Sequence, residues 1–205
     1  MAQIFGLDFG TTTTSAAFIQ NNRVNILVNR EDDLPHPSAV WYAGGDEVVV
    51  GLKAKNQLTQ AKTGIIGDVI RSLKPFLGKG TDIHVGGVAR KPVDVVGKFL
   101  SFIKKDALDR NLGPDFNRAV FTVPVDMDGR ARKELREAAL QANIGAYQMV
   151  HEPLAALYGY LRRKDDFQRR IVDLDRKIVL VFDWGGGTLD LTLCRFIGGA
   201  IVQIQ

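Results

Sequence analysis

The chain has 205 residues, of which 45% are hydrophobic and 24% charged, and its formal net charge is +4. These are ordinary values for a globular protein, and the length allows one large domain or two small ones. The sequence shows no basic stripe with interleaved aromatic residues, no run of transmembrane length and no signal peptide, so we expect neither a nucleic-acid nor a membrane partner.

An apolar strand opens the chain and ends in a turn rich in hydroxyl groups. Ile4 to Phe9 contains Asp8 and runs into Gly10-Thr11-Thr12-Thr13. The chain is then expected to return as a strand from Ser15 to Ile19, and to turn at Asn21-Asn22 into a third strand. A turn of this kind presents amides and hydroxyls that can bind an anion such as phosphate.

Residues 34–90 predict a small α+β insertion. Apolar runs on either side of glycine-containing turns predict one hairpin over residues 39–50 and another over residues 83–89. A short helix is expected at residues 52–61. His36 lies between two prolines and has no second histidine or cysteine near it, so we expect it in a solvated loop.

Strands and helices alternate after the insertion, which predicts parallel strand–helix units. A helix is expected to begin at Pro92 and end near Gly113, and a second to be capped by Asp126 or Asp128 and terminated by Gly145. Strands are predicted from Arg118 to Val123 and from Tyr147 to Val150. A third helix is predicted after Glu152-Pro153. The highly charged stretch from Arg162 to Lys177 indicates a solvated helix end and connector.

A second glycine-rich hairpin follows. Ile178 to Phe182 is uniformly apolar, which is typical of a strand buried on both faces. Asp183 and Gly185-Gly186-Gly187-Thr188 come next, and the chain returns as a strand that contains Cys194. Gly198-Gly199 then leads into a third strand. The lone cysteine excludes an intramolecular disulfide, favours a reducing, cytoplasmic location, and is expected to be a buried structural thiol.

The two ends of the chain thus carry the same pattern of strand, Asp-x-Gly turn, strand, turn and strand. Two such hairpins facing one another could hold a polyphosphate and its Mg²⁺ between them. Asp8 and Asp183 would bind the metal ion largely through its water molecules, because Mg²⁺ gives up its water reluctantly. One glycine-rich turn is weak evidence, whereas the matched pair predicts a phosphate site.

These motifs resemble the two phosphate motifs of the actin-like ATPase superfamily. Within it, the chain is similar to the nucleotide-binding domain of the seventy-kilodalton heat-shock chaperones. Two further segments carry that similarity, Val120 to Pro124 with Arg132 downstream, and Val150 to Gly159. The resemblance implies an α/β, ribonuclease H-like lobe I with a mixed sheet and flanking helices. The implied domains are residues 1–33 and 91–172 for lobe I, 34–90 for the insertion, and 177–205 for the start of lobe II.

The resemblance also implies roles for individual residues. Glu152 would orient the attacking water, and Lys74 would reach the γ-phosphate, with Arg71 as its rival. Pro124 and Arg132 would relay the nucleotide state, with Arg130 competing for the second position. The phosphates would be held by one set of residues from each motif: Thr11, Thr12 and Thr13 together with Gly10, and Gly185, Gly186, Gly187 and Thr188.

The implied function is ATP binding and hydrolysis, with ATP or ADP and Mg²⁺, in a chaperone that assists protein folding. Client polypeptides would bind a C-terminal domain beyond Gln205, and co-chaperones and a nucleotide-exchange factor are implied partners. The 205 residues are thus expected to be an inactive N-terminal fragment. A sugar or acetate kinase and an actin-like filament ATPase of the same superfamily are the alternatives. Val125-Asp126-Met127, Trp184 and Thr13 depart from the family pattern and indicate a divergent member.

Overall fold

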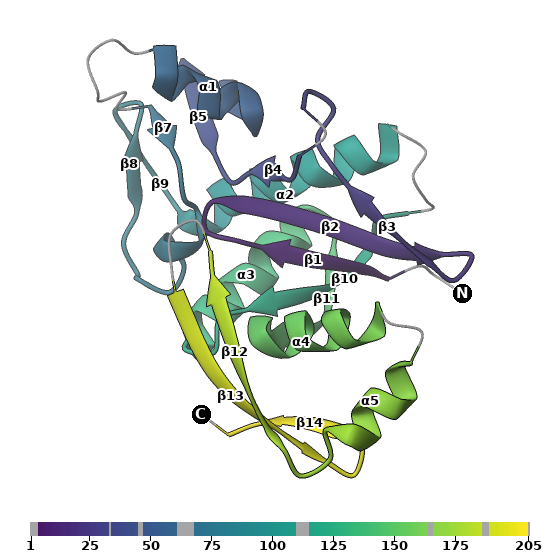
Figure 1. Cartoon of the computed structure of the whole chain (residues 1–205). Helices are drawn as coiled ribbons and strands as arrows, with labels where there is room; N and C mark the ends of the chain where they lie inside the picture. The colour runs from purple at the N-terminus through teal and green to yellow at the C-terminus, as the bar shows by residue number, and fades with distance from the viewer. Residues whose placement is uncertain are drawn as a thin grey trace. The chain divides into compact units, whose positions relative to one another are not determined.

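The computed structural model describes residues 4–32, 34–44, 47–60, 68–109, 115–163, 166–185 and 189–204. The chain forms two compact units, shown in Figure 1. The first unit consists of Met1–Phe121 and Asp126–Met149, and the second of Thr122–Val125 and Val150–Gln205. The predicted α/β class is confirmed, whereas the predicted division into lobes stays a prediction.

One sheet forms the centre of the first unit. Its strand order is β11-β10-β1-β2-β3, and β4 also pairs with β2. Phe5, Leu7 and Phe9 alternate with exposed residues along β1, so one face of this strand is buried. The helix α2 covers that face, with the rings of Phe9 and Phe99 5.9 Å apart. The elements are β1 (Phe5–Phe9), β2 (Thr13–Gln20), β3 (Arg23–Leu27), β4 (His36–Pro37), β10 (Arg118–Val123), β11 (Gly145–His151), α2 (Pro92–Asp109) and α3 (Gly129–Gln141).

The predicted insertion contains the expected hairpins and short helix. A three-stranded sheet has the order β6-β5-β7, and β8 pairs with β9 in a separate hairpin. The strand β7 was not predicted, because two residues are too few to show a period. The elements are β5 (Val40–Gly44), β6 (Glu47–Val50), β7 (Val69–Ile70), β8 (Ile83–Val85), β9 (Val88–Arg90), α1 (Leu52–Gln60) and the 3₁₀ helix η1 (Lys74–Phe76).

The prediction that His36 lies in a solvated loop is wrong. His36 is fully buried in β4, and its Nε2 donates to Asp106 Oδ2 on α2 at 3.0 Å. The other carboxylate oxygen of Asp106 lies 2.7 Å from Arg30 Nε. A buried carboxylate needs such partners, because an unpaired charge in the interior is strongly destabilising. His36 and Asp106 are 70 positions apart in the chain, so the local sequence around His36 could not reveal this contact.

Helix α3 begins as predicted and ends differently. The side chain of Asp128 accepts a hydrogen bond from the Ala131 amide at 2.7 Å, which confirms Asp128 as the N-terminal cap. Gly145 does not terminate the helix, since it is the first residue of β11. Asn143, with φ of 53°, takes the left-handed position instead, and the Ile144 amide donates back to Ala139 O at 2.8 Å.

The second unit packs two helices against a three-stranded sheet. Leu157, Leu161, Ile171, Cys194 and Phe196 form its buried core. The charged connector predicted before this sheet contains a helix, α5, whose Ile171 side chain enters the core. The prediction missed it because only a few apolar residues stand among its charges. The elements are α4 (Glu152–Arg162), α5 (Phe167–Asp173), β12 (Ile178–Trp184), β13 (Leu189–Ile197) and β14 (Ala200–Gln203), in the sheet order β12-β13-β14.

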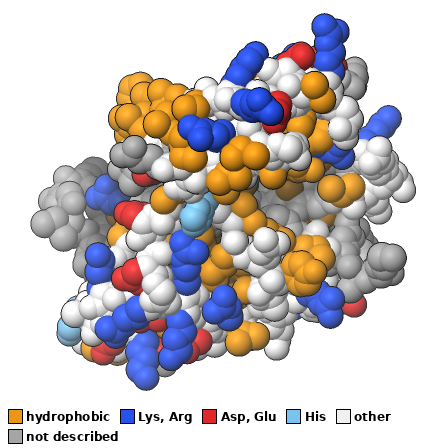
Figure 2. All heavy atoms as spheres, turned by 90° about the horizontal axis from the view of Figure 1, so that it is seen from below, with side chains coloured by type: hydrophobic (Ala, Val, Ile, Leu, Met, Phe, Trp, Pro, Cys, Tyr) orange, Lys and Arg blue, Asp and Glu red, His pale blue; other side chains and the backbone are white. Residues whose placement is uncertain are grey.

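The prediction that β12 is buried on both faces is wrong. Val179 and Val181 pack against the core, whereas Ile178, Leu180 and Phe182 on the opposite face are each more than half exposed. The helices α4 and α5 cover only one face of the sheet. The uncovered side, here called the outer face, is apolar, and exposed hydrophobic patches are visible in Figure 2. Its exposed large hydrophobic residues are Ile178, Leu180, Phe182, Trp184, Leu189, Leu191, Ile197 and Val202.

We expect the outer face to bind an apolar dye in the 205-residue chain, because a contiguous apolar patch is poorly solvated. Phe182 and Leu191 are opposite one another in the register and are each 58% exposed. Replacing both with threonine should lower dye fluorescence and change the free energy of unfolding by less than about 1 kcal/mol per site. The matched control is Val181→Thr on the covered face, which should reduce stability and leave the dye signal unchanged. A wild-type chain that binds no dye would contradict this expectation.

Cys194 is fully buried, as predicted. Burial raises the pKa of its thiol, so the reactive thiolate is disfavoured. This cysteine therefore serves packing and is unsuited to nucleophilic chemistry.

None of the helices among the described residues combines the length and apolar character needed to cross a membrane.

Candidate functional site

The two predicted phosphate hairpins have the same strand register. In the first, Phe9 pairs with Thr14, and in the second Trp184 pairs with Leu189. The connecting loops are therefore equal in length: Gly10 to Thr13 in the first unit and residues 185–188 in the second. Gly186, Gly187 and Thr188 lie outside the described residues, so their predicted roles stay predictions.

The second turn of each unit also matches. Asn21 and Asn22 connect β2 to β3 with φ of 51° and 59°, and Gly198 and Gly199 connect β13 to β14 with φ of 56° and 83°. Two consecutive residues of positive φ are characteristic of a type I′ hairpin turn, which suits the twist of the strands. The prediction that both segments are three-stranded antiparallel meanders is confirmed.

The first loop is tightly folded. A Cβ atom placed on Gly10 would overlap the carbonyl oxygen of Thr13. Only glycine therefore allows the backbone to turn back on itself at this point. Thr12 and Thr13 are exposed and Thr11 is half-buried, so the loop presents hydroxyl groups to solvent. The predicted role of Thr11, Thr12 and Thr13 in phosphate binding stays a prediction.

Ser38 contacts this loop and was not among the predicted site residues. Its amide donates to Thr12 O at 2.9 Å, and its hydroxyl donates to Gly10 O at 2.8 Å. The hydroxyl also lies 2.9 Å from Thr14 Oγ1. The residue is 28 positions away from Gly10 in the chain, and no motif marks it.

The two predicted Mg²⁺ carboxylates occupy equivalent strand positions. Asp8 is exposed and pairs with Ser15, whereas Asp183 is half-buried and pairs with Asp190. Directly opposed like charges destabilise an antiparallel pair, and a bound cation would neutralise them. The Asp183–Asp190 pair therefore fits a cation beside the second loop, although Asp190 was not among the predicted ligands. That Asp8 and Asp183 face one another across one site stays a prediction.

The two candidate cations lie in different local structures. Arg71 is exposed and directly follows β7, whereas Lys74 begins η1 and is only 9% exposed. The two residues therefore do not share one helix. The register pairs Val40 with Ile70, so Arg71 directly follows the residue paired with Val40, and Val40 lies two positions after Ser38 in the sequence.

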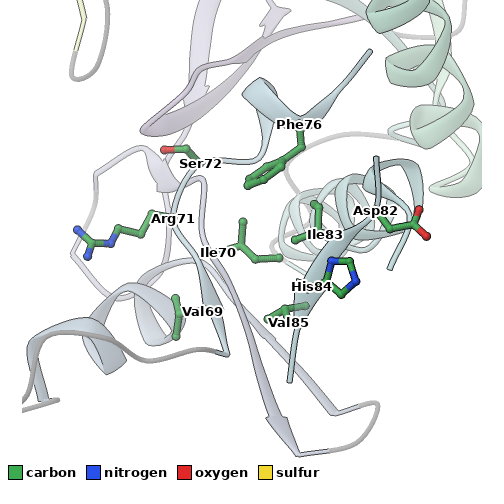
Figure 3. A pocket seen from close by; sticks show the side chains of 9 residues that line it. All are labelled: Val69, Ile70, Arg71, Ser72, Phe76, Asp82, Ile83, His84 and Val85. Carbon is green, nitrogen blue, oxygen red and sulfur yellow. The ribbon is translucent and has the colours of Figure 1, made fainter. Parts of the chain in front are cut away.

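Arg71 is also at the edge of a hollow of about 430 Å³ between β7 and β8. Figure 3 shows Ile70, Phe76 and Ile83 pointing toward one another, while the Arg71 side chain extends away from them. The guanidinium is thus directed away from this apolar hollow. The hollow is lined by Val69, Ile70, Arg71, Ser72, Phe76, Asp82, Ile83, His84 and Val85.

The predicted relay residues lie around the start of α3. Arg130 Nε contacts Glu134 Oε1 at 3.2 Å, and Glu134 Oε2 accepts from the Gly78 amide at 2.7 Å. Arg132 Nε donates to Met127 O at 2.8 Å. Arg130 is therefore linked to the segment after η1, and Arg132 to the turn before α3. Pro124 lies in the second unit, and the relay itself stays a prediction.

Glu152 is the first residue of α4 and is half-buried. The helix start is held to the sheet by His151, whose Nδ1 donates to Gln203 Oε1 on β14 at 2.7 Å. An acidic residue in the first helical turn is favoured by the helix dipole. Glu152 is thus firmly placed in the second unit, and its role toward water stays a prediction.

Comparison with known proteins gives one consistent family. A model described as "Hsp70 protein" matches residues 4–85 and 77–204. The chain is 32% identical to the chaperone protein DnaK of Metamycoplasma hominis over 96% of its length, which is 31% of that protein. It is 34% identical to DnaK of Ureaplasma urealyticum, in a match that covers 96% of this chain and 30% of that protein. It is 31% identical to DnaK of Methanothermobacter thermautotrophicus, in a match that covers 99% of this chain and 32% of that protein. The chain thus spans about a third of the length of these relatives.

Proposed function

Because the chain belongs to the Hsp70 family, we propose that it holds the phosphate-binding half of an ATPase site in a protein-folding chaperone. The supporting observation is the pair of hairpins with equal loops and an aspartate at the same strand position. The term whole protein is used here for this chain together with any sequence that continues it.

The first loop would bind phosphate through the backbone amides and hydroxyls of Thr11, Thr12 and Thr13. Gly10 permits the turn that brings these groups together. In the second loop, Gly185 with Gly186, Gly187 and Thr188 would supply the facing set. Phosphoryl transfer mainly requires groups that hold the phosphates in line and stabilise charge, which such loops provide.

Carboxylates and one cation would complete the site. Asp8 and Asp183 would hold Mg²⁺ largely through water, and the bound ion would neutralise phosphate charge. Glu152 would accept a hydrogen bond from the attacking water and orient it. Arg71 is the better-placed cation for the γ-phosphate, because it is exposed and directly follows β7, whose partner strand β5 begins two residues after Ser38. Lys74, the cation implied by the family resemblance, is its rival.

The wider role is proposed from the family. DnaK relatives are named as chaperone proteins, and by analogy the whole protein would act on unfolded polypeptides, with co-chaperones and a nucleotide-exchange factor as partners, in the cytoplasm. Pro124 with Arg132, or with Arg130, would transmit the nucleotide state to the client-binding part.

The test is ATP hydrolysis by the whole protein, measured as phosphate release with and without Mg²⁺ and without any acceptor molecule. We expect Mg²⁺-dependent conversion of ATP to ADP and phosphate. Asp183→Asn should lower turnover more than it weakens nucleotide binding, because its charge acts mainly on the transition state. Turnover only with a sugar or carboxylate acceptor would indicate a kinase, and failure to bind ATP would refute the proposal.

A further inference from the structure

Ser38 makes three hydrogen bonds to the first loop and its neighbour. Its amide contacts Thr12 O, and its hydroxyl contacts both Gly10 O and Thr14 Oγ1. Ser38 and Thr14 are both fully buried. Buried polar groups are costly unless they are hydrogen-bonded, so these contacts fix the position of the loop.

The direction of these bonds can be deduced. A carbonyl oxygen can only accept, so the single hydroxyl proton of Ser38 is used on Gly10 O. The hydroxyl of Thr14 must then donate to Ser38 Oγ. The result is a chain in which Thr14 donates to Ser38 and Ser38 donates to Gly10, and bonds in such a chain polarise and strengthen one another.

This arrangement decides which polar groups the loop offers to solvent. The carbonyl oxygens of Gly10 and Thr12 point toward buried Ser38. A carbonyl oxygen directed at a phosphate would repel it, whereas amide and hydroxyl hydrogens attract it. We propose that Ser38 is a positioning residue that turns these two carbonyls away from the nucleotide's phosphates and so preorganises the first loop. This inference rests on the proposed nucleotide function and deepens it.

Ser38 is itself firmly held. It directly follows β4, which pairs with β2 through Thr13–Pro37 and Thr14–His36. His36 donates to Asp106 of α2, so β4 is joined to both the sheet and a helix. A rigid support of this kind is what a preorganised binding group requires, because a small displacement of the loop weakens its contacts with ligand.

The test compares ATP with adenosine as ligands for the whole protein. Ser38→Ala removes the hydroxyl and with it the hydrogen bond to Gly10 O and the one from Thr14 Oγ1. ATP binding should weaken about tenfold, since the Gly10 carbonyl is no longer held by an oriented donor. Adenosine affinity should not change, because adenosine has no phosphate to contact the loop. A merely structural defect would weaken both ligands. Calorimetric titration measures both affinities, and thermal unfolding reports stability.

Thr14→Val is the matched control. It removes the first donor of the chain but leaves the bond from Ser38 to Gly10, so ATP affinity should fall less than in Ser38→Ala. Ser38→Cys, with a weaker donor of similar size, should lie between wild type and Ser38→Ala, and it serves if the alanine variant does not fold. Wild-type ATP affinity in Ser38→Ala would overturn the inference and leave the proposed function standing. A wild-type protein that binds no ATP would overturn both.

Discussion

Gly10→Ala is expected to reduce ATP affinity and turnover of the whole protein about a hundredfold, because a misplaced binding group can cost that much. The added Cβ would overlap the Thr13 carbonyl oxygen, which is backbone and cannot rotate away. The loop must therefore open, and the phosphate contacts proposed for its amides and hydroxyls would be lost. The free energy of unfolding should fall by about 1–3 kcal/mol.

Gly6→Ala is the matched control, since it makes the same chemical change in the strand that leads into the loop. A Cβ on Gly6 would lie 3.9 Å from its nearest neighbour, Ala17 O, which is an ordinary contact. Its ATP affinity should remain within about twofold of wild type. Equal losses in the two variants would mean that the strand, rather than the loop, is sensitive. Isothermal titration with ATP and steady-state phosphate release provide the measurements.

Arg71→Ala is expected to lower turnover about 10²–10³-fold while nucleotide affinity changes less than tenfold. A guanidinium at the γ-phosphate acts mainly on charge that develops during transfer, which explains the difference between the two effects. Lys74→Ala should mainly lower stability, by about 1–3 kcal/mol, because Lys74 is a nearly buried side chain in η1.

Single-turnover hydrolysis by the two alanine variants, each at a temperature well below its unfolding midpoint, separates these roles. Arg71→Lys is the conservative variant and should recover part of the lost rate, because it restores charge without the planar fork. If Lys74→Ala loses turnover while Arg71→Ala does not, the cation is Lys74, as the family resemblance implies.

Features with a short-range cause could be predicted from the sequence. Both three-stranded meanders could be predicted, because Gly-Gly and Asn-Asn turns between alternating strands have a local signature. The cap of α3 could be predicted only as Asp126 or Asp128, because a carboxylate just before an apolar helical period is a standard start signal, and the structure identifies Asp128. The other end of α3 could not be predicted as well. Glycine is the usual residue at the end of a helix, so Gly145 is expected there, but Asn143 takes the left-handed conformation instead.

Features with a long-range cause could not be predicted. The burial of His36 depends on Asp106, and the link between Ser38 and Gly10 depends on the pairing of β4 with β2. The sequence of β12 indicates a strand buried on both faces, but the structure covers only one. A run of apolar residues shows what a strand can bury, whereas its actual burial depends on which elements lie beside it.

A double-mutant cycle tests whether the two hairpins act on one Mg²⁺–nucleotide. Asp8→Asn, Asp183→Asn and the double variant of the whole protein are compared in Mg²⁺-dependent ATP turnover. If the two carboxylates serve one ion, the double variant should be little slower than the slower single variant, since residues that act as a unit are strongly non-additive. Rate losses that multiply in the double variant would show two independent sites and contradict the proposed shared site.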